Sequence, residues 1–85
     1  DEHIDVHEME KIIKGAVSLL PPKCKEVFLL SRHNGMKNKE IAETLNLSIK
    51  TVEKHISKAL MQIRKVLDEK GYLLYFLLFD FFFNK

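Results

Sequence analysis

The segment KNKEIAETLNLSIKTVEKHISKAL, residues 37–60, constrains the fold of this chain more than any other stretch. Apolar residues recur in it three and four positions apart, which is the spacing of one face of an α-helix. The spacing predicts two amphipathic helices separated by a four-residue hinge at residues 46–49. A short helix, a tight turn and a longer helix make a helix-turn-helix arrangement, so the chain is predicted to contain one.

The residues of the hinge suit a sharp change of direction. Asn46 can adopt the left-handed backbone conformation that such a turn requires. Ser48 is predicted to cap the longer helix, leaving N–H groups and the positive end of the helix dipole available to a phosphate. Six apolar residues are predicted to form the shared core that fixes the angle between the helices: Ile41, Ala42, Leu45, Leu47, Val52 and Ile56.

The residues before this motif predict two more helices. One begins after Asp5, its N-cap, and ends before the prolines at 21–22. The next begins at Pro22 and ends before Gly35, with its buried face predicted to comprise Cys24, Val27, Phe28 and either Leu29 or Leu30. The third helix is predicted over roughly 39–45 with Asn38 as its cap. The fold class is therefore all-α: a four-helix domain, residues 1–71, with a C-terminal helix-turn-helix.

The long fourth helix has two distinct faces when its residues are placed 100° apart. One sector holds the apolar residues, predicted to face inward: Ile49, Val52, Ile56, Ala59, Leu60, Ile63, Val66 and Leu67. Lys54 lies opposite, flanked by Lys50, Thr51, Ser57, Lys58, Met61 and Lys65. In a helix-turn-helix the second helix enters the DNA major groove by its N-terminal half, so this outward face is predicted to contact DNA.

The charge distribution supports that prediction. The net charge of the whole chain is only +2, but residues 36–67 carry seven Lys/Arg against three Asp/Glu, a net charge of +4, and the flanking segments are each −1. A basic excess on the motif is where a polyanion would be bound. The sequence contains no Gly-rich phosphate loop, no paired carboxylates in a plausible pocket and no nucleophile–base pair, so no enzymatic activity is predicted.

The segment at residues 72–85 is an apolar, aromatic C-terminal tail, separate from the predicted domain. Seven of the eight Phe and Tyr residues lie in 72–83, with Asp80 as the one charge among them. The tail is shorter than the roughly 20 apolar residues that cross a bilayer. It could fold back on the first two helices, bind a partner protein or contact a membrane, and self-association through its aromatic residues is possible.

The remaining candidate residues favour structural roles. Cys24 is the only cysteine, so no internal disulfide can form; a core thiol and a reducing, cytoplasmic location are predicted. His3 and His7 share a helix face without a third ligand at a fixed spacing, so no metal or cofactor is predicted. His55 is predicted to pack at the flank of the fourth helix, with a phosphate contact as the alternative. Arg32 and His33 are predicted to be surface or C-cap groups, with contact to the DNA backbone as an alternative for Arg32. The first residue is Asp1, and we expect the chain to be a fragment of a longer protein.

The motif also resembles a known family. The residues that carry the resemblance are Leu20-Pro21 with Val27-Phe28, Glu40-Ile41-Ala42, Ser48, Thr51-Val52 and Ala59-Leu60 through Leu67. They are similar to region 4 of the extracytoplasmic-function (ECF) group of bacterial sigma-70-family factors, which recognises the promoter −35 element. The resemblance covers about residues 9–67. Asn46 stands where that family usually has glycine, and Lys37 where a small capping residue is common.

The resemblance implies a role in transcription initiation and a set of partners. These are promoter DNA, the β flap of the RNA polymerase core and an anti-sigma factor, with a nucleoid-associated location. It also implies roles for individual residues: base-facing positions at Glu53, Lys54, Ser57 and Lys58, and backbone contacts at Lys50 and Thr51. Glu53 could instead form a salt bridge with Lys50 or Lys54.

Two other interpretations remain open. Residues 38–57 resemble the DNA-binding output domain of LuxR-type response regulators almost as well, although LPPKCKEVF and the long first helix favour the sigma factor. The chain could also be a protein-interaction module whose functional surface is the aromatic tail. A salt titration separates the last from DNA binding, because phosphate contacts weaken steeply as salt rises.

Overall fold

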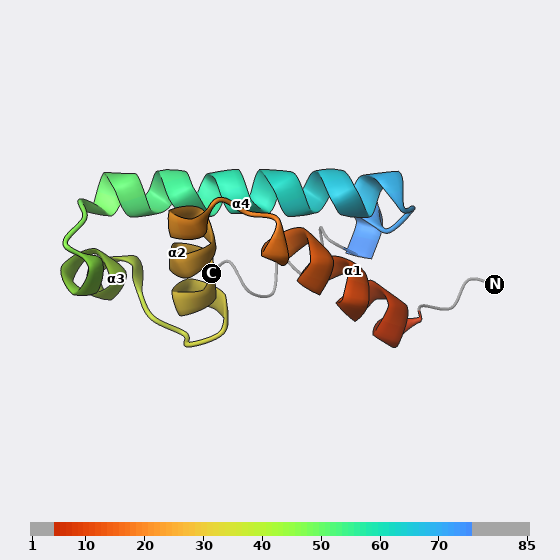
Figure 1. The fold of residues 1–85 in the computed structure, drawn as a ribbon, viewed down its shortest axis with the longest axis horizontal. Helices are drawn as coiled ribbons and strands as arrows, with labels where there is room; N and C mark the ends of the chain where they lie inside the picture. Colours follow the sequence, from red (N-terminus) through yellow and green to blue (C-terminus); the bar gives the residue numbers. More distant parts are fainter. Residues whose placement is uncertain (1–4, 76–85) are drawn as a thin grey trace.

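The computed structural model describes residues 5–75 and shows four α-helices, with no strand in that range. The helices are α1 (Val6–Ser18), α2 (Pro22–Arg32), α3 (Asn38–Leu45) and α4 (Ile49–Glu69), and residues 73–75 add a short helical turn (Figure 1). The predicted all-α, four-helix architecture is confirmed.

Helix α4 is the central element of the fold, and the other three helices pack on it. At 21 residues, α4 is about 32 Å long. Helices α1, α2 and α3 each contact it and lie on the same side of it, with α3 at its N-terminal end and α1 beside its C-terminal half (Figure 1). No other helix of residues 5–75 lies on the opposite side of α4 (Figure 1).

The ends of α1 and α2 follow from their capping residues. The Asp5 carboxylate accepts a hydrogen bond from the Glu8 N–H at 3.1 Å, which confirms Asp5 as the N-cap of α1. Pro22 is the first residue of α2, as predicted. Beyond α2, Gly35 has a φ of +68°, in the left-handed region that glycine adopts without steric cost, and there the chain turns toward α3.

The start of α3 differs from the prediction. Asn38 was predicted as its cap, but Lys37 occupies that position and Asn38 is the first helical residue. A lysine side chain has no hydrogen-bond acceptor. The Glu40 carboxylate compensates by accepting the Lys37 N–H at 2.8 Å, which is the second half of a capping box. The signal for this start was therefore the glutamate three residues into the helix.

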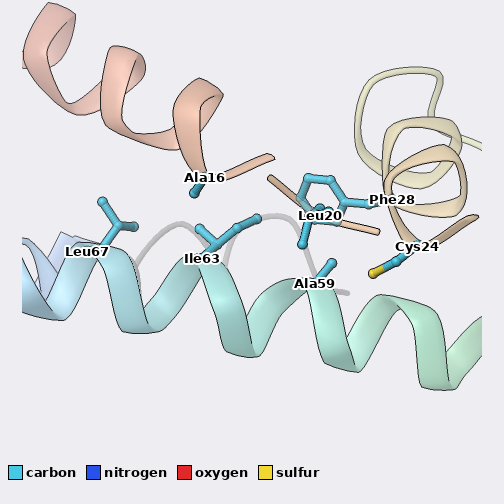
Figure 2. Packing of buried hydrophobic residues seen from close by; sticks show 7 residues of the cluster. All are labelled: Ala16, Leu20, Cys24, Phe28, Ala59, Ile63 and Leu67. Atoms are coloured by element: carbon cyan, nitrogen blue, oxygen red, sulfur yellow. The ribbon is translucent and has the colours of Figure 1, made fainter. Parts of the chain in front are cut away.

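Two clusters of buried side chains hold the helices together. The first cluster joins α1, α2 and the C-terminal half of α4 (Figure 2); its buried members are Ala16, Leu20, Cys24, Phe28, Ala59, Ile63 and Leu67. The second cluster joins α2, α3 and the N-terminal half of α4; its buried members are Val27, Ile41, Ala42, Val52 and Ile56. Leu30 packs against the second cluster whereas Leu29 is 41% exposed, which decides the alternative left open for the buried face of α2.

Ile49 is the one residue of the predicted inward sector of α4 that lies mostly outside the core. It is 45% exposed, so its predicted burial is wrong. Helical side chains tilt toward the N-terminus of their helix. Because Ile49 is the first residue of α4, its side chain is directed back past the end of the helix, and it is absent from both clusters.

The beginning of the aromatic tail can be followed as far as Tyr75. Tyr72 packs against the first cluster, and the rings of Tyr72 and Tyr75 lie 5.9 Å apart between centroids. The rest of the predicted tail, residues 76–85, lies outside the described residues. The division into a domain at 1–71 and a tail at 72–85 therefore stays a prediction.

Candidate nucleic-acid interface

The hinge between α3 and α4 turns sharply at Asn46. This residue has φ 58° and ψ 48°, the left-handed conformation predicted from the sequence. The Leu47 N–H donates to the Ala42 carbonyl at 2.9 Å, so the end of α3 is closed by a backbone hydrogen bond. Together these features fix the direction in which the chain enters α4.

Ser48 caps α4 and orders its first turn. Its hydroxyl accepts a hydrogen bond from the Thr51 N–H at 3.0 Å and donates to the Thr51 hydroxyl oxygen at 2.9 Å. Ser48 is thus confirmed as the cap. The cap satisfies one N–H group; those of Ile49 and Lys50 have no acceptor within the helix, as in the first turn of any α-helix. With the helix dipole they make this end of α4 electropositive.

The second cluster braces the N-terminal half of α4 against α3. Ile41 and Val52 have no exposed surface, and Ala42 and Ile56 are buried beside them. Leu45 and Leu47 pack at the edge of the same cluster, so all six predicted core residues meet in one place.

Val27 of α2 also belongs to this cluster, with no exposed surface. Periodicity assigned Val27 to the buried face of its helix. It could not show which other helix that face would contact, because spacing along one helix carries no information about its neighbours.

The outward side chains of α4 form one shallow surface along the helix. The residues that line it are Lys50, Glu53, Lys54, Ser57, Lys58 and Met61. Five of the six predicted DNA-contacting residues are therefore brought together. Thr51 is outside this group because it is half-buried at the cap, where its hydroxyl bonds with Ser48.

Met61 was not among the predicted site residues. It is 65% exposed and extends the surface by one turn of α4. Its position flanking Lys54 at 100° per residue was the available signal. We name the six residues Lys50, Glu53, Lys54, Ser57, Lys58 and Met61 the outward surface.

The outward surface carries three lysines and one carboxylate. Among the described residues, Glu53 forms no ion pair with Lys50 or Lys54. The salt bridge considered as an alternative role for Glu53 is therefore not observed. The surface is therefore net positive, and its carboxylate remains able to accept a hydrogen bond. Contact of these residues with DNA stays a prediction.

Cys24, a member of the first cluster, forms a hydrogen bond to the main chain of α4. Its Sγ lies 3.1 Å from the His55 carbonyl oxygen and donates a hydrogen bond to it, and the residue is fully buried. Burial raises the pKa of the Cys24 thiol above its ordinary value, and the nearby positive charge of Lys58 opposes part of that increase. These features agree with a core thiol. His55 itself is half-buried, as expected of a packing residue.

Arg32 and His33 lie at the end of α2, away from the outward surface. His33 is the C-cap of the helix and is exposed. The Arg32 guanidinium lies 5.8 Å from the centroid of the Phe28 ring and donates to the Ser31 hydroxyl at 2.9 Å. Arg32 is half-buried, so it is less of a surface group than predicted.

The described residues contain neither a metal-binding cluster nor a membrane-spanning helix. No three His, Cys, Asp or Glu side chains among residues 5–75 are grouped so that they could hold a metal ion, and His3 lies outside that range. No helix in the described part of the chain combines the length and the apolar character needed to span a bilayer.

Comparison with known proteins identified one family. The family model described as "Sigma-70, region 4" matches residues 10–63. The matched range begins in the first turns of α1 and ends in α4, so it contains the hinge, the second cluster and the whole outward surface. No curated protein and no solved structure gave a significant match.

Proposed function

Because the chain belongs to the family of sigma-70 region 4 domains, we propose that it recognises the promoter −35 element as domain 4 of an ECF sigma factor. In this role it directs RNA polymerase to initiate transcription. Region 4 is a DNA-binding, non-catalytic helix-turn-helix domain that interacts with promoter DNA and with the polymerase core. The ECF subtype and the individual contacts are the parts that we propose.

The observation that carries the proposal is the outward surface itself. Three lysines project from one side of α4, while the second cluster braces the opposite side of the same turns. The major groove of B-DNA is about 12 Å wide and admits one α-helix. A helix braced on one side and cationic on the other is suited to enter it by its N-terminal half.

We propose distinct roles for residues along the first three turns. Lys50 and Thr51, at the electropositive start of α4, contact phosphates; the Thr51 hydroxyl accepts from Ser48 and can still donate its own proton. Lys54, Ser57 and Lys58 contact base edges. Glu53 accepts a hydrogen bond from a cytosine N4 amino group, which is the base group that a carboxylate pairs with in the major groove.

The proposal extends to partners and location. We propose that the polymerase contact is made with the β flap, that an anti-sigma factor regulates access to the domain, and that the protein works in the cytoplasm at the nucleoid. The domain would then have two surfaces in use at once, one for DNA and one for polymerase.

Footprinting of polymerase complexes tests the DNA contacts. Lys54→Ala and Lys58→Ala should each weaken occupancy of the −35 element. For a lysine that contacts a base, the loss should be about 1–3 kcal/mol and concentrated at one base pair. Lys11→Ala, which removes an exposed lysine from α1, is the matched control and should leave the footprint unchanged. Unchanged occupancy for both α4 variants would refute the assignment.

A second experiment separates the sigma-factor interpretation from the LuxR-type one. The chain alone should bind the −35 element weakly and bind it well when polymerase core is present. Tight binding to a palindrome by a dimer, without polymerase, would support the LuxR-type interpretation instead. Binding that persists as salt rises would point to an apolar protein interface, because each phosphate contact contributes a slope of about −0.9 in log K against log salt.

A further inference from the structure

A groove with an apolar lining lies between α1 and α2. Its volume is about 430 Å³, far above the ~30 Å³ that one water occupies. Ile13 and Val17 of α1 and Phe28 and Leu29 of α2 supply the apolar lining, and no residue of α4 contributes to it. The groove is therefore separate from the outward surface.

The sides of the groove are positively charged. Lys14, Lys25 and Arg32 line it, and no Asp or Glu is found among the described residues that do so. A segment that fits the groove must therefore offer apolar side chains for the floor and is favoured if it also carries a negative charge.

Residues 76–85 of the same chain have that chemistry, with the sequence FLLFDFFFNK. Five phenylalanines and two leucines surround one acidic residue, Asp80, and the one basic residue, Lys85, lies five positions further on. We propose that this groove is the docking site of residues 76–85, which cover Ile13, Val17 and Leu29 and bring the Asp80 carboxylate to the positively charged sides. The inference does not depend on the DNA-binding proposal.

The segment follows closely after a residue that packs beside the groove's own cluster, and as a helix it would be about as long as α2. Tyr72 already packs against the first cluster, which also contains Phe28 of the groove. Ten residues follow Tyr75. They span about 15 Å as a helix and at most about 33–36 Å when extended. The eleven-residue helix α2, which forms one side of the groove, is itself about 16 Å long.

Docking of this segment would bury apolar surface on both sides of the contact. The aromatic side chains would be removed from contact with neighbouring molecules, and the groove would be closed to other proteins. The isolated chain should therefore be monomeric, and a partner that needs the α1–α2 face would have to displace the segment.

Isotope-filtered NMR of the full chain tests the proposal directly. In a mixture of labelled and unlabelled protein, nuclear Overhauser effects should connect the phenylalanine rings of 76–85 with the methyl groups of Ile13, Val17 and Leu29 within one molecule. Effects observed only between molecules would overturn the proposal in favour of a second copy as the occupant. Their absence in both filters would overturn it as well.

A pair of leucine variants tests the consequence for association. Leu29→Glu places a carboxylate in the groove and should release the segment, so sedimentation velocity should show dimers or larger species. Leu19→Glu is the matched control, because Leu19 is 78% exposed and does not line the groove; it should stay monomeric. Circular dichroism establishes that both variants are folded. Equal behaviour of the two folded variants would overturn the proposal.

Discussion

The two halves of α4 are buried in similar ways but held in place by different means. The bracing half, residues 59–69, rests on α1 and α2 through the first cluster, which includes the large side chain of Phe28. The recognition half, residues 49–58, rests on α3 and α2 through the smaller, purely aliphatic second cluster. The recognition half begins with a left-handed asparagine, Asn46, and a side-chain cap at Ser48, whereas the bracing half ends at a left-handed glycine, Gly71.

This difference shows that burial alone does not mark the functional half of the helix. Both halves contribute residues with almost no exposed surface, such as Val52 in one and Ile63 in the other. The recognition half is distinguished by local hydrogen bonds that fix where the helix begins, and by the lysines opposite its buried side. Stability and DNA recognition should therefore respond differently to changes in the two halves.

The largest expected effect comes from truncating one buried isoleucine in each cluster. Ile41→Ala and Ile63→Ala each remove a side chain with at most 1% exposure, and each should lower the free energy of unfolding by about 2–5 kcal/mol. Only Ile41→Ala should also weaken promoter binding per folded molecule, because it loosens the contact that orients the recognition half. Urea denaturation and footprinting with polymerase provide the two measurements.

The comparison between the halves would fail in one clear way. If Ile63→Ala, corrected for its folded fraction, reduced promoter binding as much as Ile41→Ala, then the two clusters would act as a single unit. The hinge would then have no separate role in orienting α4.

The next effect concerns the left-handed residues at the two ends of α4. Asn46 precedes the recognition half with a φ of 58°, and Gly71 follows the bracing half with a φ of 86°. An alanine in this region costs roughly 1–2 kcal/mol, so Asn46→Ala and Gly71→Ala should both lower the unfolding free energy, the first somewhat less because asparagine is already strained there.

Promoter binding should separate these two variants. Asn46→Ala should reduce it, whereas Gly71→Ala should not. Asn46→Gly is the control, because glycine adopts the same φ freely and should leave both quantities nearly unchanged. A loss of binding in Asn46→Gly would show that the asparagine side chain, and not the backbone conformation, matters at this position.

The features that the sequence predicted well depend on local interactions. Asp5, Ser48 and Asn46 act within three residues of their own positions, so their roles follow from residue type and spacing alone. The overall helical architecture followed from the same short-range periodicity. Local determinants of this kind are visible in a single sequence.

The features that could not be predicted from the sequence depend on the neighbouring helices or on the position of a residue within its helix. Periodicity could not choose between Leu29 and Leu30, because both lie near the apolar sector and only the packing of α3 decides. Ile49 fell in the right sector but at a helix end, where no neighbour covers it. The start of α3 was misassigned because the cap came from the Glu40 side chain and not from the residue before the helix.

A smaller effect is expected from the caps of α4 and α1. Ser48 and Asp5 each accept one backbone N–H, at 3.0 and 3.1 Å. Ser48→Ala should cost about 1 kcal/mol, the typical value for a lost N-cap. Asp5→Ala should cost only a few tenths, since the one buried residue of α1 is Ala16 and a first turn without buried side chains opens with little free energy. Equal losses in thermal denaturation would show that the start of the recognition half is no better held than the start of α1.

The smallest effect lies where the two halves meet, at Cys24 and Lys58. Because burial raises the pKa of the Cys24 thiol, the unfolded chain loses this proton near its ordinary value of 9.0 while the folded protein retains it. Above that pH the unfolded state binds fewer protons, so stability falls as pH rises. The slope cannot exceed about 1.36 kcal/mol per pH unit, and below pH 9.0 this contribution is complete.

Urea denaturation at about pH 8, 9 and 10 gives the free energy of unfolding of the unmodified protein and of Cys24→Ala. The difference between the two measures the loss due to the thiol, because the lysines titrate in both proteins. The Lys58 charge opposes the burial effect, so Lys58→Ala should raise the pKa of the thiol further and prolong the decline to higher pH. Lys54→Ala, one turn earlier on the outward surface, is the control and should leave the profile unchanged. An identical profile in Cys24→Ala would mean that the thiol does not titrate in this window. In that case the charge of Lys58 would have no measurable influence on the interior behind the outward surface.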